Sequence, residues 1–329
     1  FDNAGANTDI VENGTFVNVL NVMPLPLYDD ERELTDNKER ARRGLPPVRQ
    51  GLPALGDPAY LSTRGSRMDR ALNYRVVFST DADQIAVAPG ELHREWTEAG
   101  RRYFDYRMER PIVPRISLSS ARYQISRDTW NGLPVEVYHD ARHPWNVGTM
   151  LKTSKSALEY YSRNFAPYMF KYFRIVEHPG YEDHAQAFPG TVPYTETVGF
   201  LTDLSGWAPL DLATCHELAH MWWGGMAYGA FMQGRKVLNE GVAEYSSLLM
   251  LKQQEDPRWL REVLASRHDQ YLSGRKGASM PEQPVIRAED EQPHITYGKS
   301  AHVVFALQEL IGADKVNTAL RNFLDKFGF

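Results

Sequence analysis

One short run has the residue types and spacing for metal chemistry: His216, Glu217 and His220. Residues four positions apart lie on one face of a helix, so the two histidines can direct two imidazole nitrogens at a single metal ion. Glu217 stands beside the first histidine, where it can accept a proton from water at that metal. The alternative is an amphipathic helix that buries two hydrogen-bonded histidines.

Glu240 is the predicted third ligand, and 19 residues separate it from His220. A hydrolytic zinc site uses three protein ligands and keeps one position open for water or substrate. The intervening residues allow the first helix to end near residues 224–225 and a second helix to begin with Asn239 as its N-cap. The sequence therefore predicts one Zn²⁺ ion held by both histidines and Glu240.

Glu244 lies four positions after Glu240 and so on the same helix face. A ligating histidine usually donates its other ring N–H to a carboxylate or carbonyl, and Glu244 is the predicted acceptor for His216. The alternative is a solvent-exposed carboxylate on the helix surface. Cys215, the single cysteine, points about 100° away from His216 around the helix and is predicted to be a buried thiol and not a ligand.

These residues resemble the gluzincin zinc metallopeptidases, specifically the aminopeptidase N and leukotriene hydrolase type. The resemblance rests on residues 216–220 and on the Asn-Glu-Gly run at 239–241. A second stretch, Tyr-Gly-Lys-Ser-Ala at 297–301, resembles that family's Tyr-Glu-Lys-Gly-Ala segment. There the tyrosine hydroxyl stabilises the oxyanion of the reaction, and the resemblance gives Tyr297 this role. Without that context, Tyr297 would be read as an ordinary buried tyrosine.

Two departures from the family pattern stand out. The spacing between the second histidine and Glu240 is one residue longer than is usual there and matches thermolysin; a turn absorbs such an insertion easily. The family's aminopeptidases also carry a Gly-x-Met-Glu-Asn segment whose glutamate holds the free amino group of the substrate. In residues 193–200 only Glu196 and Gly199 keep that pattern. Glu196 is thus the candidate amine anchor.

The resemblance implies a multidomain α and β fold, and the length of 329 residues also favours two domains. Residues 1–137 are expected to form a β-rich N-terminal domain, a β-sandwich. Residues 138–329 are expected to form a thermolysin-like catalytic domain, mainly helical with a small sheet. The chain ends about where the catalytic domain should close, so the family's large C-terminal helical domain is expected to be missing from it. Members that lack such family features form a divergent branch, which the resemblance associates with transporter-like membrane segments.

Local patterns give a coarse map of the elements. β-branched and aromatic runs predict strands, and Asn131-Gly132 predicts a hairpin turn. Apolar residues at helical spacing predict a helix from Trp145 onward. Residues 25–60, rich in proline, arginine and acid, are expected to be an extended surface segment, with a loop or short helix at 38–43. The predicted strands are 73–79, 103–108, 123–126, 135–138, 174–177 and 198–204.

Composition narrows the class of protein. The chain has 42% hydrophobic residues and a net charge of -5, which fits a globular protein and argues against general nucleic-acid binding. One cysteine excludes an intrachain disulfide, and no apolar run is long enough to span a membrane. The chain starts at Phe1 and is expected to be a processed or excised piece. Cytoplasm and periplasm both stay open as its location, with tethering to a membrane protein as an option.

Three hypotheses follow. The first is a zinc aminopeptidase that removes N-terminal residues from peptides. The second is a zinc endopeptidase or narrow processing peptidase, which the thermolysin-like spacing and the weak match around Glu196 favour. The third is a non-catalytic, peptidase-like binding domain of a membrane assembly.

Overall fold

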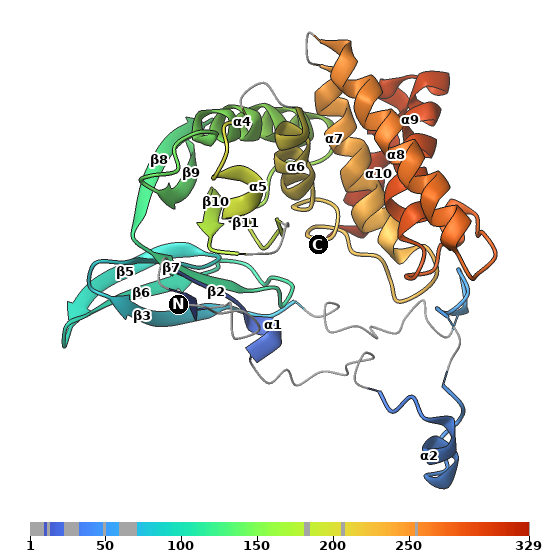
Figure 1. The fold of residues 1–329 in the computed structure, drawn as a ribbon, viewed down its shortest axis with the longest axis horizontal. Coiled ribbons are helices and arrows are strands. Elements are labelled where there is room, and N and C mark those ends of the chain that lie inside the picture. The colour runs from blue at the N-terminus through green and yellow to red at the C-terminus, as the bar shows by residue number, and fades with distance from the viewer. Residues whose placement is uncertain are drawn as a thin grey trace.

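The computed structural model describes residues 10–11, 14–22, 33–48, 51–58, 71–180, 185–204, 208–253 and 256–328. Within them, several small sheets come first and most helices come later. Figure 1 shows the sheets on one side of the molecule and the bundle of late helices on the other. The expected mixture of a β-rich first part and a mainly helical second part is therefore present.

Two antiparallel sheets in the first part share a buried cluster. Ala86 and Ala88, on and just after one strand, meet Phe104 and Tyr106 from a strand of the other sheet. The four-stranded sheet has the order β1 (Ile10–Val11), β2 (Gly14–Asn18), β7 (Ser117–Ala121), β4 (Ile85–Val87). The three-stranded sheet has the order β3 (Arg75–Asp81), β6 (Arg101–Arg107), β5 (Glu91–Glu98). The strands predicted at 73–79 and 103–108 correspond to β3 and β6.

A third sheet lies beneath the first long helix and has the order β11, β10, β9, β8. β8 (Tyr123–Trp130) and β9 (Leu133–Asp140) form the predicted hairpin, whose turn residues Asn131 and Gly132 both have positive φ. β9, β10 (Phe173–His178) and β11 (Thr191–Thr195) run parallel to one another. The boundary expected between residues 137 and 138 falls inside β9, because this hairpin pairs with strands of the later part of the chain.

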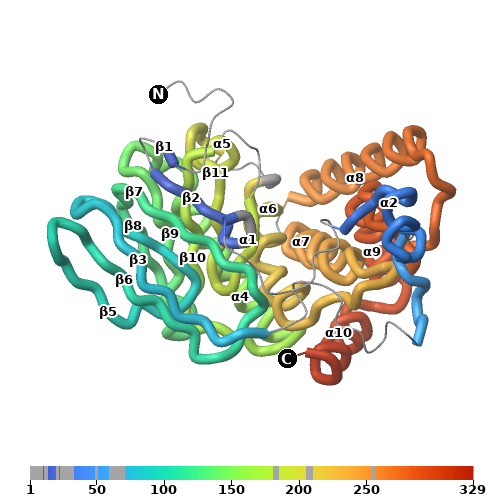
Figure 2. Tube along the Cα trace, turned by 90° about the horizontal axis from the view of Figure 1, so that it is seen from below, coloured from blue at the N-terminus to red at the C-terminus, as the bar shows by residue number. Residues whose placement is uncertain are grey.

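Helices cover the third sheet and continue away from it. α4 (Val147–Asn164) confirms the helix predicted after Trp145, and its Met150, Leu158 and Tyr161 are fully buried in the main core. Its neighbour α6 packs between α4 and α7. Figure 2 shows α8 and α9 on the side of the molecule opposite to β3, β5 and β6. The later helices are α6 (Ala208–Ala219), α7 (Val242–Lys252), α8 (Pro257–Gly277), α9 (Ser300–Ile311) and α10 (Ala313–Phe327).

The strand predicted at 198–204 is wrong. The nearest strand, β11, ends at Thr195, before the predicted range begins. The short helix α5 (Glu196–Gly199) follows it directly. The reason is a side chain: the buried Asn146 amide donates to the carbonyls of Gly199 (2.7 Å) and Thr202 (2.8 Å). Those carbonyls therefore bond to a side chain and not to a neighbouring strand.

The described parts of the predicted extended segment 25–60 divide into two. Residues 37–42 form the short helix α2 (Asn37–Arg42), capped by the Asp36 side chain, so the cluster at 38–43 is helical. Residues 51–58 run along the later part of the chain: the Leu52 N–H donates to Glu289 Oε2 (2.7 Å), and Pro53 O accepts from the Gln233 N–H (2.9 Å). Residues 25–32, 49–50 and 59–60 lie outside the described residues.

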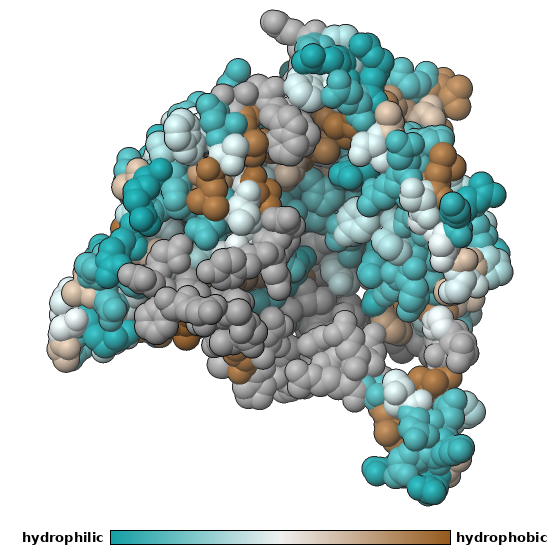
Figure 3. Space-filling model, viewed as in Figure 1, coloured by the Kyte–Doolittle hydropathy of each residue, from teal (hydrophilic) through white to brown (hydrophobic). Residues whose placement is uncertain are grey.

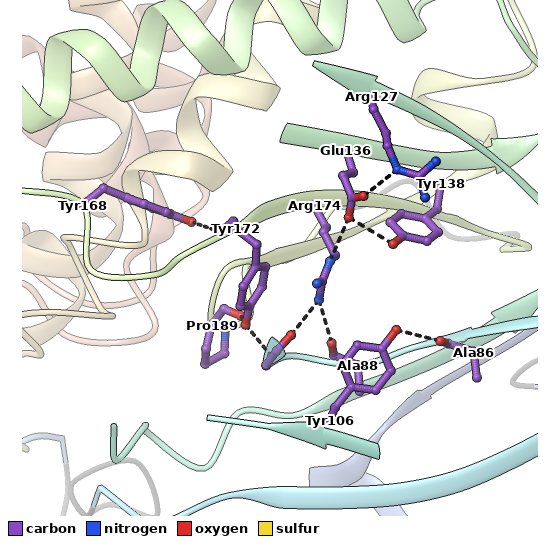
Figure 4. A network of polar contacts seen from close by, with 11 residues as sticks. Ala86, Ala88, Tyr106, Arg127, Glu136, Tyr138, Tyr168, Tyr172, Arg174 and Pro189 are labelled. Carbon is purple, nitrogen blue, oxygen red and sulfur yellow. Dashed lines mark hydrogen bonds and ion pairs between the residues drawn. The ribbon is translucent and has the colours of Figure 1, made fainter. Parts of the chain in front are cut away.

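A buried arginine joins the first part to the third sheet. The Arg174 guanidinium on β10 donates to Gly90 O (2.8 Å) and Ala88 O (3.3 Å) after β4, and to Glu136 Oε2 (3.2 Å) on β9. Figure 4 shows these bonds, with the Tyr172 ring beside the guanidinium and its hydroxyl on Pro189 O. Because a buried charge without partners is costly, this network fixes how the two parts meet.

Among the described residues that are coloured in Figure 3, hydrophobic ones are scattered among hydrophilic ones. Among the described residues, no helix combines the length and apolar composition needed to cross a bilayer.

Candidate metal centre

The end of α6 places both histidines of the sequence motif. His220 lies one turn beyond His216, with its N–H bonded to His216 O, and the chain then turns sharply. Gly224 has φ +100°, a conformation that favours glycine, and a Cβ on Gly225 would come within 2.7 Å of His220 O. The helix itself ends at Ala219, so the predicted end near residues 224–225 is too late, and the two glycines lie in the turn that follows. Trp223 anchors this turn by donating from its indole N–H to Ser246 Oγ on α7 (3.1 Å).

Three side chains converge at one point. His216 Nε2 and His220 Nε2 each lie 3.4 Å from Glu240 Oε2. The possible ligand atoms of these three residues all lie within 4.8 Å of one another, close enough for one metal ion to draw them together. All three are buried or half-buried.

The outer ring nitrogens of both histidines are already engaged. His220 Nδ1 lies 2.9 Å from Trp223 O, and a carbonyl can only accept, so Nδ1 carries the proton. His216 Nδ1 lies 3.1 Å from Glu244 Oε2, and the other oxygen of Glu244 accepts from Arg267 Nε on α8 (2.5 Å). Both Nε2 lone pairs are therefore directed inward, which is the tautomer a metal ligand needs.

The local charge also fits a cation. Although burial opposes the charged imidazole, hydrogen bonds with Glu240 and Glu244 raise the pKa of His216 well above 6.5. Burial opposes ionisation of Glu244, but His216 and Arg267 outweigh it and lower the pKa of Glu244 to about 2. The pocket thus stabilises positive charge between two carboxylates. Two neutral imidazoles and one carboxylate are a donor set that suits Zn²⁺, so the residues present fit this ion.

Glu217 and Tyr297 lie beside the converging ligands. Burial raises the pKa of Glu217, against the effect of the two neighbouring histidines. The Tyr297 ring centroid is 6.5 Å from that of His216, and burial together with the Glu240 carboxylate raises the pKa of Tyr297. The structure therefore brings a carboxylate that can exchange protons and a protonated phenol to the same place as the ligands.

The segments that carry Glu240 and Tyr297 are both π-helical: η2 (Val237–Gly241) and η4 (His294–Lys299). Such wide turns are frequent at functional sites. They also pack closely, because a Cβ on Gly241 would come within 2.9 Å of Ser300 Cβ at the start of α9. Asn239 lies inside η2 and is not the predicted N-cap; its side-chain oxygen accepts from the Gly229 N–H (3.2 Å) instead.

Glu196, the candidate amine anchor, lies elsewhere. It begins α5 and lines a cavity of about 810 Å³ together with His143 and Glu177 at the carboxyl ends of the parallel strands. Neither His220 nor Glu240 lines that cavity. Its carboxylate is grouped with His143 and Glu177, and its role as the amine anchor stays a prediction.

Two residues of the site have no counterpart in the sequence analysis. Arg267 holds Glu244 from α8, and Arg115, from the loop between β6 and β7, shares a cavity of about 220 Å³ with His220 and Glu240. Neither lies near the motif in sequence. Only the packing of distant elements brings them there, so no local pattern could have indicated them.

Fold and site together define a metallopeptidase-like molecule, with a helix-borne histidine pair, a distant glutamate and an adjacent carboxylate. The Peptidase family M1 domain matches residues 149–329, which is more than half of the chain. The chain belongs to this family. The membership confirms the resemblance to zinc metallopeptidases of the aminopeptidase N type.

Several named relatives support the same assignment. The chain is 26% identical over 192 residues to "Probable aminopeptidase 1" of Sulfurisphaera tokodaii, covering 54% of this chain and 24% of that protein. It is 22% identical over 217 residues to "Endoplasmic reticulum aminopeptidase 2" of Homo sapiens, covering 63% of this chain and 22% of that protein. The chain thus spans about a quarter of the length of these curated relatives.

A solved structure supports the fold. The crystal structure of a mutant M1 zinc metallopeptidase from Deinococcus radiodurans matches with a TM-score of 0.61 at 18% identity, covering 78% of this chain and 57% of that one. At this identity, the similarity concerns the fold alone.

Proposed function

We propose that this chain hydrolyses peptide bonds with one zinc ion and acts as an aminopeptidase. The observation that carries the proposal is the convergence of His216 Nε2, His220 Nε2 and Glu240, each histidine having its other nitrogen engaged outside. The names of the family relatives support removal of N-terminal residues in particular. The endopeptidase and non-catalytic alternatives have no comparable support.

Each side chain has a chemical task in this proposal. Zinc, when bound by His216, His220 and Glu240, would supply Lewis-acid polarisation. Glu217 accepts a proton from the attacking water and delivers it to the leaving amine, a cycle that its raised pKa suits. Tyr297 keeps its proton and donates a hydrogen bond to the carbonyl oxygen as negative charge develops there.

The Glu244 carboxylate has a positioning task. One of its oxygens lies 3.1 Å from His216 Nδ1 while Arg267 holds the other, so its charge favours one orientation and one tautomer of the imidazole. Glu244 thereby acts on the metal through His216 and does not touch the substrate.

A test separates the aminopeptidase from the endopeptidase. The zinc-loaded protein is given a short peptide with a free N-terminus and the same peptide acetylated there, and products are identified by mass spectrometry. Release of single N-terminal residues from the free peptide alone is expected, since acetylation removes the ammonium group that an aminopeptidase recognises. Internal cleavage of both peptides would contradict the proposal and support an endopeptidase.

We further infer that the two sheets of the first part form the N-terminal β-sandwich of this type of peptidase. The buried cluster of Ala86, Ala88, Phe104 and Tyr106, drawn from both sheets, supports this. Attachment to membrane domains outside the chain, and a cytoplasmic or periplasmic location, stay predictions.

A further inference from the structure

A positively charged cavity adjoins the candidate metal ligands. It has a volume of about 220 Å³, and both His220 and Glu240 line it. Three cationic side chains line it too: Arg115 from the β-rich part, and Arg235 and Lys236 from the helical residues directly before η2. A group bound here would therefore lie next to the reacting bond.

Arg235 and Lys236 both contact the same acidic residue, Asp290, within the described part of the chain. The Arg235 guanidinium is paired with both carboxylate oxygens of Asp290. Lys236 Nζ lies 3.3 Å from the backbone carbonyl oxygen of Asp290 and 4.0 Å from its Oδ1. One carboxylate thus serves two cations. The Glu240 carboxylate is turned toward the histidines.

Arg115 adds a further positive charge. Its guanidinium lies over the Phe188 ring, 5.7 Å from the centroid, and the side chain is half-buried. Among the residues that the structure describes, Arg115 is in no ion pair, unlike the buried Arg174, which has Glu136. Its charge acts on the Glu217 carboxylate only at longer range, so the half-buried guanidinium still has hydrogen-bond donors for a carboxylate of a ligand.

A second, apolar cavity continues the first along the chain segment before β11. Ala187, Phe188 and Pro189 line it, and Arg115 and His220 line both cavities. Within the described residues 185–189 of this segment, no side chain is acidic. The surroundings of the metal ligands on this side therefore favour an apolar contact followed by a negative group.

We propose that Arg115, assisted by Arg235 and Lys236, forms a subsite that binds a carboxylate of the peptide substrate beside the metal centre. The inference rests on the proposed peptidase function and names its substrate class: peptides with a carboxylate close to the scissile bond. This carboxylate is either the C-terminus of a short peptide or an acidic side chain. Arg115 determines specificity, and Glu217 with the metal ligands performs the reaction.

Two matched pairs of peptides test the proposal. Tri-alanine is compared with its C-terminal amide, and an amidated tripeptide containing Glu is compared with the same peptide containing Gln. The zinc-loaded wild type is expected to prefer the carboxylate peptide of at least one pair by about ten- to hundredfold in kcat/KM, the range of a charge-assisted hydrogen bond. The pair that shows the preference identifies the source of the carboxylate.

The variant Arg115→Ala should bring that ratio to about 1, and Arg115→Lys should restore part of it because the charge returns without the fork of donors. Arg94→Ala is a matched control, since Arg94 also lies over an aromatic ring, that of Trp96, and is in no ion pair with the other described residues. It lies on β5 and does not line the cavity. It should keep the wild-type ratio. No preference in either pair, or an equal loss for both members of a pair in Arg115→Ala, would overturn the proposal.

A binding measurement separates this inference from the peptidase proposal. The same four peptides are titrated calorimetrically into zinc-loaded Glu217→Gln, which should bind without turnover. Tighter binding of the carboxylate peptides, lost in the double variant with Arg115→Ala, supports the subsite even if the wild type hydrolyses none of them. Equal affinities in Glu217→Gln would reject the subsite whether or not the wild type is a peptidase.

Discussion

The molecule holds histidine and glutamate side chains close together in two places. At the end of α6, His216 and His220 meet Glu240, and at the carboxyl ends of β9 and β10, His143 and Glu177 meet Glu196 from α5. In both groups, the possible ligand atoms lie within 4.8 Å of one another. Residue types and proximity therefore do not distinguish the two.

The difference lies in where the ring nitrogens point. In the first group, both Nδ1 atoms are engaged outside, and both Nε2 atoms stop 3.4 Å short of Glu240. In the second group, His143 Nδ1 contacts Glu177 directly, and that carboxylate also accepts from the Asp140 N–H (2.6 Å). In the second group the one histidine contacts a carboxylate through its own Nδ1, whereas in the first two Nε2 atoms face the same oxygen of Glu240. Preorganised lone pairs, and not mere proximity, make a metal site.

The largest contrast is expected in metal content. His220→Ala removes one of three ligands, so the protein should lose its bound zinc and its peptide hydrolysis. His143→Ala removes the histidine of the second group and should retain about one zinc ion per chain. Elemental analysis of the two purified variants measures this. Loss of zinc in His143→Ala alone would reverse the comparison.

Glu217→Gln should leave zinc binding intact while kcat falls by about 10² to 10⁴, because the amide cannot take up the proton of water. Glu196→Gln is the matched control from the second group, and its kcat should stay near the wild-type value. Steady-state kinetics with a free tripeptide provides the comparison. An equal loss of kcat in both variants would show that Glu196 takes part in the reaction.

Glu244→Gln tests the outer engagement of His216. Removing a charged partner of a ligating histidine typically weakens metal binding by about 10- to 100-fold. The chain should therefore release zinc to a competing chelator at a correspondingly lower chelator concentration, with its circular dichroism spectrum unchanged. Zinc affinity equal to that of the wild type would show that the Glu244 carboxylate only packs.

The smallest effect is expected for Glu177→Gln, which alters the second group without touching the first. The free energy of unfolding should change by about 1–3 kcal/mol, as for other buried hydrogen-bonded groups, with zinc content unaltered. Burial raises the pKa of Glu177 above 4.5, so the folded chain binds its proton more tightly than the unfolded chain does.

The stability that this proton contributes is present below pH 4.5 and is lost as the pH rises through the raised pKa. The stability advantage of wild type over Glu177→Gln should therefore shrink with rising pH, as measured by urea unfolding at several pH values. An advantage that grows instead would mean that the ion pair with His143 outweighs burial.

The local elements were predictable where one short-range pattern dominates. The Asn131-Gly132 turn predicted its hairpin, and the apolar spacing after Trp145 predicted α4. The prediction failed at 198–204, where the buried amide of Asn146, more than fifty residues earlier, takes the carbonyls that a strand would have used. A contact of that sequence separation leaves no trace in the local pattern.

The sequence by itself determined the pair His216 and His220 and the pair Glu240 and Glu244, because helical spacing relates residues that are close along the chain. The need of a zinc site for a third protein ligand then linked the two pairs. The sequence could not place Glu196 or find Arg115 and Arg267. The residues that surround them come from other elements. Whether a charged side chain belongs to a site therefore depends on which side chains the packing places next to it. The tertiary structure alone decided which histidine and glutamate group leaves lone pairs open, and which cations surround the site where a substrate would bind.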